Sequence, residues 1–89
     1  MNLEEKIGKA IAEVLEELYG EKVATNRISL QPTRKDFEGN YTFVTFPFTK
    51  IAKQKPEAIG EAIGALLVKK EPIVSAFNVV KGFLNLSIS

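Results

Sequence analysis

Apolar side chains recur at steps of three and four residues through the first part of the chain. They are Leu3, Ile7, Ala10, Ile11, Val14, Leu15 and Leu18. This period predicts an amphipathic helix over residues 2–19 that buries the stripe. Asn2 can cap the first turn, because Glu5 follows it at the spacing of a capping box. Gly20 can end the helix in a left-handed conformation.

The middle of the chain has shorter patterns, interrupted by proline and glycine. Residues 27–31 alternate between polar and apolar side chains, and residues 41–46 are aromatic or β-branched, so we expect two strands. The polar residues 32–40 between them predict a loop. Pro47 and Pro56 can each open a helix, because the first turn of a helix needs no amide hydrogen from them.

These prolines predict a short helix over residues 48–55 and a longer one over residues 57–69. Gly60 and Gly64 lie four residues apart in the longer helix, so another element can approach that face closely. The stripe expected to be buried consists of Ile59, Ile63, Leu66 and Leu67.

The C-terminal part predicts an antiparallel hairpin. Residues 73–80 and 83–89 are its strands, joined by the two residues Lys81 and Gly82. The alternation in the last strand places Leu84, Leu86 and Ile88 on a buried face. It places Phe83, Asn85, Ser87 and Ser89 on the opposite face, which we expect to be open to solvent. The short connection pairs Val80 with Phe83, and Asn78 with Asn85, on that outer face.

These elements together predict one α+β domain over residues 1–89. The sheet is expected to be mostly antiparallel, with about four strands. One long helix precedes it, and two helices lie between its second and third strands.

Composition narrows the chemistry that such a domain can perform. The 89 residues carry a net charge of +1 and include no cysteine and no histidine. Disulfides, thiolate zinc sites, histidine-ligated metals and histidine-based triads are therefore excluded. Asp36 and Glu38 share a charged loop, where acids are more often solvated than catalytic. We predict no catalytic residue and no metal site, and a small hydrolase would lack both nucleophile and base.

The hydropathy pattern also indicates where in the cell the protein is expected. No apolar run approaches the roughly 20 residues of a membrane helix. The first residues are acidic, whereas an export signal would begin with basic residues. We therefore expect a cytoplasmic protein without a membrane partner.

Charge is distributed unevenly along the chain. Residues 1–21 sum to −4, residues 22–55 to +5, and residues 56–89 to zero. A basic middle can attract a polyanion to one face. The alternative is that these lysines and arginines only keep a small domain soluble. The candidate phosphate contacts are Arg34, Lys35, Lys50 and Lys53.

One cluster on the predicted hairpin has the composition of a nucleic-acid site. Phe83 is expected on the outer face beside Asn78 and Asn85, with Lys81 at the turn. Aromatic, amide and cationic groups together are typical of proteins that hold single-stranded or looped nucleic acid. The alternative is that Phe83 packs under a neighbouring loop or domain.

Four short segments carry a family resemblance. Residues 36–42, Asp-Phe-Glu-Gly-Asn-Tyr-Thr, resemble a Gly-Asp-Tyr segment. Residues 51–53, Ile-Ala-Lys, resemble Leu-Ala-Lys, and residues 55–59, Lys-Pro-Glu-Ala-Ile, resemble Asn-Pro-Arg-x-Ile/Ala. Residues 79–86, Val-Val-Lys-Gly-Phe-Leu-Asn-Leu, resemble a Gly-Phe-Ile-Asn-Phe signature. In this order, the whole chain is similar to the N-terminal additional domain of arginyl-tRNA synthetases.

The resemblance implies a domain that docks on the elbow of tRNA. In the family, an aromatic residue and a following amide contact a D-loop nucleotide, and by motif position these are Phe83 and Asn85. Another polar contact falls on Val80, which cannot hydrogen-bond through its side chain, so Asn78 is the substitute candidate. Tyr41 of the first segment and Lys81 complete the candidate tRNA-binding set.

The resemblance also implies a longer parent enzyme, an ATP-using arginine–tRNA ligase of class I with tRNA(Arg) as its partner. The two catalytic signatures of that class are absent from this chain. We therefore expect a monomeric, non-catalytic fragment without a cofactor of its own, whose neighbour is the catalytic domain of the same chain. The alternative is a protein-interaction or oligomerisation domain without RNA contact, in which the Phe83 face is an apolar docking surface.

Overall fold

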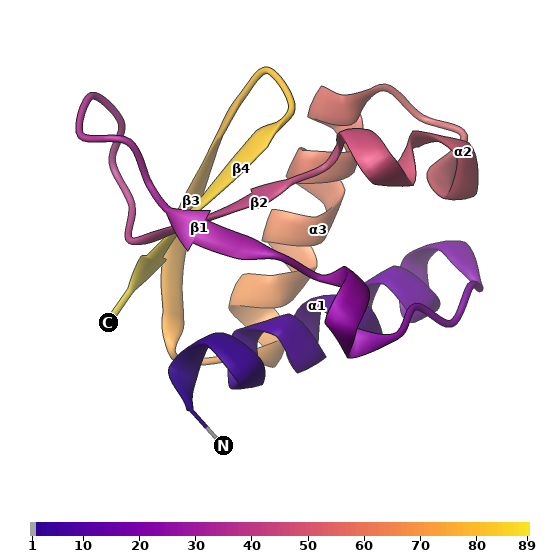
Figure 1. Cartoon of the computed structure of the whole chain (residues 1–89), viewed down its shortest axis with the longest axis horizontal. Helices are drawn as coiled ribbons and strands as arrows, with labels where there is room; N and C mark the ends of the chain where they lie inside the picture. The colour runs from indigo at the N-terminus through magenta and orange to yellow at the C-terminus, as the bar shows by residue number, and fades with distance from the viewer. Residues whose placement is uncertain (1) are drawn as a thin grey trace.

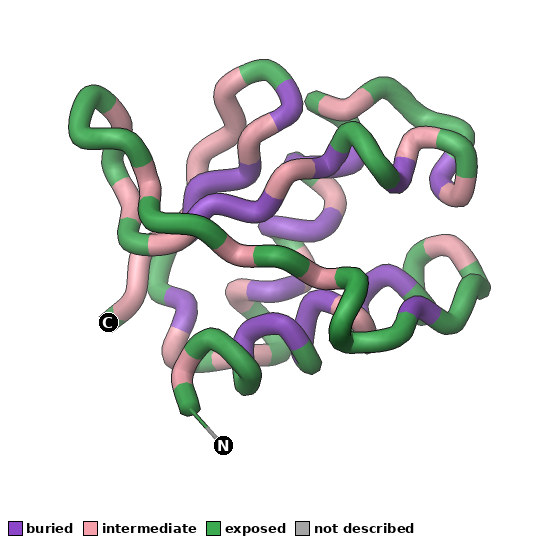
Figure 2. The backbone as a smooth tube through the Cα atoms, viewed as in Figure 1, coloured by how far each residue is buried: buried purple, intermediate pink, exposed green. Residues whose placement is uncertain are grey.

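The N-terminal periodicity forms helix α1, Leu3–Tyr19, as predicted. In this computed structural model, which describes residues 2–89, the Asn2 side-chain oxygen accepts a hydrogen bond from the Glu5 amide at 2.8 Å. Gly20 ends the helix with φ of 72°, and its amide donates to the Glu16 carbonyl. The expected burial of Leu18 is wrong: this residue, in the last turn of α1, is 38% exposed. Residues 16–19 are all exposed or half-buried, as the colours at the C-terminal end of α1 show (Figure 2).

Four strands form one antiparallel sheet in the order β1-β2-β4-β3 (Figure 1). The bounds are β1 Leu30–Pro32, β2 Tyr41–Val44, β3 Val74–Val80 and β4 Phe83–Ile88. The first strand begins later than predicted, because Thr25–Arg27 form a 3-10 turn, η1. The second ends at Val44, two residues earlier than predicted, and Phe46–Phe48 form a second 3-10 turn, η2.

Two helices connect β2 to β3, as the sequence predicted. Helix α2, Thr49–Ala52, is shorter than expected, because Lys53 adopts a left-handed conformation with φ of 55° and ends it. Helix α3 covers Pro56–Lys70 and begins at a proline. The predicted α+β class, with one long first helix and an antiparallel sheet, is confirmed.

The core lies between the helices and the inner face of the sheet. Helix α3 packs along β3 and β4, and α1 packs against α3. The two helix glycines make this close approach possible. A Cβ atom on Gly64 would lie 2.3 Å from the Phe77 ring, and one on Gly60 would lie 3.0 Å from Val79. The predicted stripe of α3 is buried at Ile59, Ile63 and Leu67, with Leu66 half-buried.

Candidate nucleic-acid interface

A row of polar side chains crosses the outer face of the sheet, opposite the helices. The strand register pairs Gln31 with Thr42, Thr42 with Asn85, and Asn85 with Asn78. The predicted hairpin register, Val80 with Phe83 and Asn78 with Asn85, is confirmed. The pleat therefore puts one residue from each of the four strands in line on this face.

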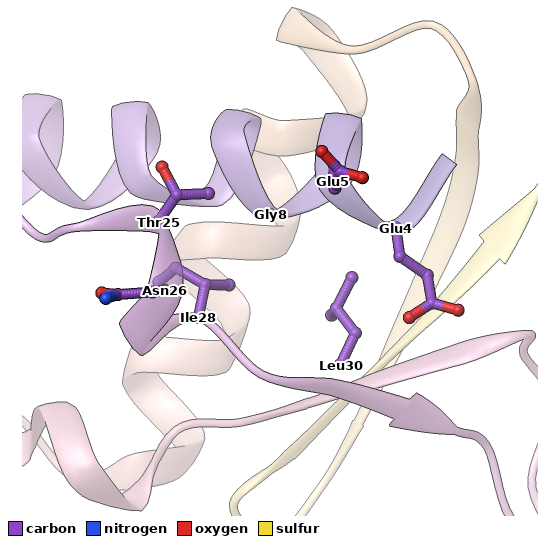
Figure 3. A pocket seen from close by; sticks show the side chains of 7 residues that line it. All are labelled: Glu4, Glu5, Gly8, Thr25, Asn26, Ile28 and Leu30. Carbon is purple, nitrogen blue, oxygen red and sulfur yellow. The ribbon is translucent and has the colours of Figure 1, made fainter. Parts of the chain in front are cut away.

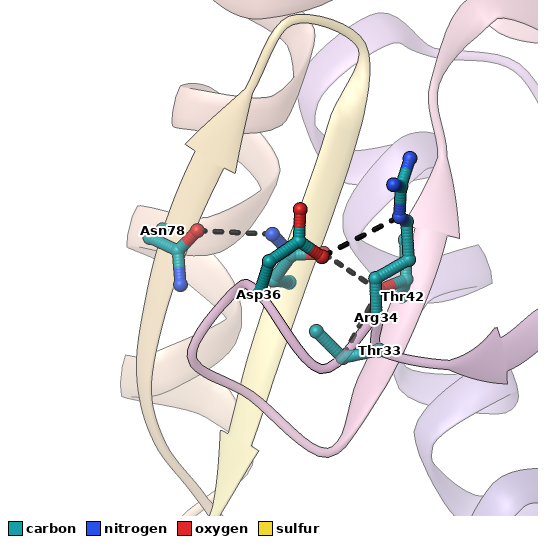
Figure 4. Close-up of polar contacts among 6 residues, drawn as sticks. Thr33, Arg34, Asp36, Thr42 and Asn78 are labelled. Carbon is teal, nitrogen blue, oxygen red and sulfur yellow. Dashed lines mark hydrogen bonds and ion pairs between the residues drawn. The ribbon is translucent and has the colours of Figure 1, made fainter.

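Hydrogen bonds join most of this row to the β1–β2 loop, residues 33–40 (Figure 4). The Thr42 hydroxyl lies 2.6 Å from the Asn85 side-chain oxygen and 2.9 Å from the Thr33 hydroxyl. Because an amide oxygen only accepts, Thr42 donates to Asn85, and Thr33 donates to Thr42. The Asn85 amide donates to the Asn78 oxygen at 3.0 Å, and the Asn78 amide donates to the Glu38 carbonyl at 2.8 Å.

This network corrects the prediction that Asn85 lies on an open face. Asn85 is 1% exposed, because the β1–β2 loop folds over the sheet and covers it. Gly39 permits this close approach: its φ is 139°, and a Cβ atom there would lie 3.2 Å from the Asn85 Cβ. The loop and Asn85 are more than forty residues apart in sequence, so strand alternation alone could not predict the cover.

Beside the covered part, the outer face keeps a small open hollow. Phe83 is half-buried there, and the Phe37 ring of the loop lies at the same hollow. The space it encloses, about 20 Å³, is far below the roughly 300–1,000 Å³ of small-molecule sites. A hollow this small cannot enclose a metabolite, so a ligand could only lie across its opening, against the Phe83 and Phe37 rings. The other lining residues are Gln31, Pro32, Arg34, Thr42 and Asn85.

Arg34 gives the hollow a positive charge. Its guanidinium carbon lies 5.7 Å from the centre of the Phe37 ring, within the range of a cation–π contact. Its Nε also lies 3.5 Å from an Asp36 carboxylate oxygen (Figure 4). The side chain remains 75% exposed, so a phosphate can compete for the guanidinium.

Phe46 places an exposed ring next to the half-buried Phe83, a contact that the sequence did not predict. It is 50% exposed, and the two ring centres lie 6.2 Å apart at an interplanar angle of 83°, an edge-to-face pair. The Phe46 ring also covers Gly82, where a Cβ atom would lie 2.4 Å from it. Phe46 lies at the end of the strand predicted over residues 41–46, so the local pattern did not indicate a ring in a separate turn beside Phe83.

The basic candidates divide into separate groups. Arg34 and Lys35 lie in the β1–β2 loop, whereas Lys50 and Lys53 belong to α2 and its C-terminal cap. In Figure 1 these segments lie on opposite sides of the β3–β4 hairpin, with Lys81 at the hairpin turn between them. All five side chains belong to exposed residues. These cations therefore do not form one continuous patch, and of the five it is Arg34 that lines the aromatic hollow.

Two other candidates are placed away from the open hollow. Tyr41 pairs with Leu86 in the register and shares its inner, helix-facing side, so the structure does not bring it to Phe83. Asn78 lies on the predicted outer face, but its amide bonds the Glu38 carbonyl and its oxygen accepts from Asn85. Its place in the loop network leaves it few free polar atoms for a ligand.

A larger groove lies between α1 and the segment from η1 to β1 (Figure 3). Two carboxylates, from Glu4 and Glu5, stand at its rim, and no basic residue lines it. Its negative charge is unsuited to a phosphate backbone. The outer face of the sheet is therefore the better candidate for a polyanion.

Within residues 2–89, no group of three histidine, cysteine, aspartate or glutamate residues is arranged to hold a metal ion. No helix in the same range is long and apolar enough to cross a membrane.

The fold and the outer face define a class: a small α+β domain whose antiparallel sheet has helices on one side and a partly open aromatic face on the other. Comparison with known proteins identifies the family. The sequence matches the family described as "Arginyl tRNA synthetase N terminal domain" over residues 2–88. The chain belongs to this family, which confirms the resemblance inferred from its motifs.

Individual relatives agree with this assignment. The chain is 45% identical over 89 residues to an arginine–tRNA ligase of Bacteroides fragilis and 47% identical over 90 residues to one of Phocaeicola vulgatus. The alignments cover 100% of this chain and 15% of each relative. A solved arginyl-tRNA synthetase of Thermus thermophilus superposes with a TM-score of 0.81 at 26% identity, over 99% of this chain and 14% of that one. The chain thus spans about one seventh of the length of these relatives.

Proposed function

We propose that this chain binds tRNA through the outer face of its sheet, around Phe83. The observation that carries the proposal is the half-buried Phe83 ring in a hollow that the Arg34 side chain also lines. An exposed ring can stack on an unstacked base, and such bases occur in RNA loops and not within regular duplexes. Arg34 in the loop and Lys81 at the turn can neutralise neighbouring phosphates.

The family suggests which part of the RNA this is. The resemblance implies docking on the tRNA elbow, with a D-loop nucleotide against the Gly-Phe-x-Asn motif at residues 82–85. The relatives are named arginine–tRNA ligases, so we propose that the chain serves such a ligase in the cytoplasm. There it would orient tRNA(Arg), while a catalytic domain elsewhere in the same protein joins ATP-activated arginine to the tRNA.

A second function is favoured by the exposed ring of Phe46. Phe46 and Phe83 form an apolar edge at the end of the hairpin. Exposed apolar patches often mark protein contacts, so this edge could dock another protein or domain without RNA. Charge distinguishes the alternatives, because RNA binding requires the basic side chains and weakens steeply with salt, whereas apolar docking does not.

A gel-shift titration of the chain tests the proposal. The probes are an arginine-accepting tRNA transcript of Bacteroides fragilis and a fully paired RNA duplex of equal length, both at low salt. We expect tighter binding to the tRNA, because only the tRNA offers unstacked loop bases. Equal affinity for both RNAs would show that the chain is attracted only to phosphates and does not bind unstacked bases. No binding to either would contradict the proposal and favour the apolar docking surface.

A further inference from the structure

Gln31 stands at the end of the polar row with a free amide. It lies in β1, opposite Thr42 in the register, and it is exposed and lines the hollow beside Phe83. Among residues 2–89, the side-chain hydrogen bonds of this row join Thr42, Asn85 and Asn78 and do not include Gln31. Gln31 is therefore the member of the row whose amide can serve a ligand.

Two other polar residues at the hollow are buried. Asn85 is 1% exposed, and its amide oxygen and nitrogen both bond within the network. Thr42 is 4% exposed, and its hydroxyl bonds Asn85 and Thr33. Each group keeps a free proton or lone pair, but a ligand could reach either one only by displacing the residues that bury it.

The remaining polar side chain at the hollow, Arg34, has donors only. The edge of a nucleobase presents both hydrogen-bond donors and acceptors. A glutamine amide can bond both at once, because its oxygen accepts and its nitrogen donates. Gln31 combines this capacity with exposure and a position on a strand of the sheet. A strand holds a side chain more firmly than a loop does, which favours discrimination between similar ligands.

We propose that Gln31 reads the edge of the RNA base that stacks on Phe83, while Asn85 holds the β1–β2 loop in place. The inference rests on the proposed RNA binding and adds to it the residue that determines base preference. Gln31 lies more than fifty residues before the Gly-Phe-Leu-Asn motif, so the motif itself does not include it.

The test measures base preference as well as affinity. Arginine-accepting tRNA transcripts are prepared with each of the four bases at each unpaired position of the elbow loops, and the chain is titrated against them. We expect the unaltered chain to prefer one base at one position by about 5- to 150-fold, the range of a bidentate amide–base contact. In Gln31→Ala the preference at that position should fall to within about twofold, while affinity for the least favoured base stays unchanged.

Gln54→Ala is the matched control, because Gln54 is an exposed glutamine between α2 and α3. It should retain the full preference. The inference is overturned if Gln31→Ala keeps the preference, if it weakens binding equally for every base, or if the unaltered chain shows no preference. In these cases RNA binding itself still stands. If the unaltered chain binds no tRNA, the proposed function fails and the inference fails with it.

Discussion

Asn85 belongs to the family motif, but its burial gives it a structural role in holding the β1–β2 loop. Its amide joins β2, β3 and the β1–β2 loop through Thr42 and Asn78, with both bonds inside a covered part of the sheet. Buried polar networks of this kind stabilise one arrangement, provided that each member is satisfied. The arrangement here places Phe37 and Arg34 of the loop at the hollow beside Phe83.

Asn85→Ala should therefore lower the stability of the chain. The substitution leaves the Thr42 hydroxyl and the Asn78 oxygen without their partner, and we expect a loss of about 1–3 kcal/mol in the free energy of unfolding. Urea denaturation followed by circular dichroism measures it. Asn26→Ala, at an exposed position of η1, is the control and should change stability by no more than about 0.5 kcal/mol. Equal effects in the two variants would show that the network contributes nothing.

At the scale of elements, close contact between α3 and β3 depends on glycine. The Phe77 ring occupies the place that a Cβ atom on Gly64 would need, at 2.3 Å. Gly8 in α1 is different, because a Cβ there would meet Ile28 and Thr25 at 3.8 Å, an ordinary contact distance. The same substitution should thus have opposite effects in the two helices.

Gly64→Ala should destabilise the chain by about 1–3 kcal/mol, since the new methyl group forces α3 and β3 apart. Gly8→Ala should instead stabilise it by up to about 1 kcal/mol, because alanine favours a helix more than glycine does and the space is available. Thermal unfolding of both variants provides the measurement. A stabilised Gly64→Ala variant would show that α3 and β3 are not packed as described.

The elements differ in how far the sequence could predict them. Helix α1 and the β3–β4 hairpin were predicted with nearly correct bounds, because a capping residue, a left-handed glycine or a two-residue turn fixes each end locally. The start of β1 and the end of α2 were misplaced, since η1 and the left-handed Lys53 depend on neighbours outside the local pattern. At the candidate site, the alternation correctly placed Phe83 on the outer face. It could not show that the loop covers Asn85 or that Phe46 reaches Phe83.

At the scale of the whole molecule, charge is arranged around the hairpin. The loop carries Arg34 and Lys35 on one side, and the α2 segment carries Lys50 and Lys53 on the other (Figure 1). A tRNA elbow lying across the hairpin end would meet both groups, whereas a short single strand in the hollow would meet only the loop. The salt dependence of binding can distinguish these two arrangements.

Each phosphate contact that is removed should lower the slope of log affinity against log salt by about 0.7–0.9. We expect a reduction from Arg34→Ala with Lys35→Ala, and a further one when Lys50→Ala and Lys53→Ala are added. Filter binding to tRNA between 50 and 200 mM salt, roughly the range over which such contacts are usually resolved, measures the slopes. An unchanged slope after the second pair is removed would place the α2 segment outside the interface.

Stacking of the Phe83 ring on an RNA base can be tested by comparing the tRNA affinities of Phe83→Ala and Phe83→Leu. Leucine keeps most of the apolar packing of the half-buried ring but cannot stack. We predict that both variants lose about ten- to a hundred-fold in affinity, following the roughly 1–3 kcal/mol of a stacked base, while both remain folded in urea titrations. If Phe83→Leu binds tRNA as tightly as the unaltered chain, or if affinity falls only because the variants unfold, the ring supports the fold and does not bind a base.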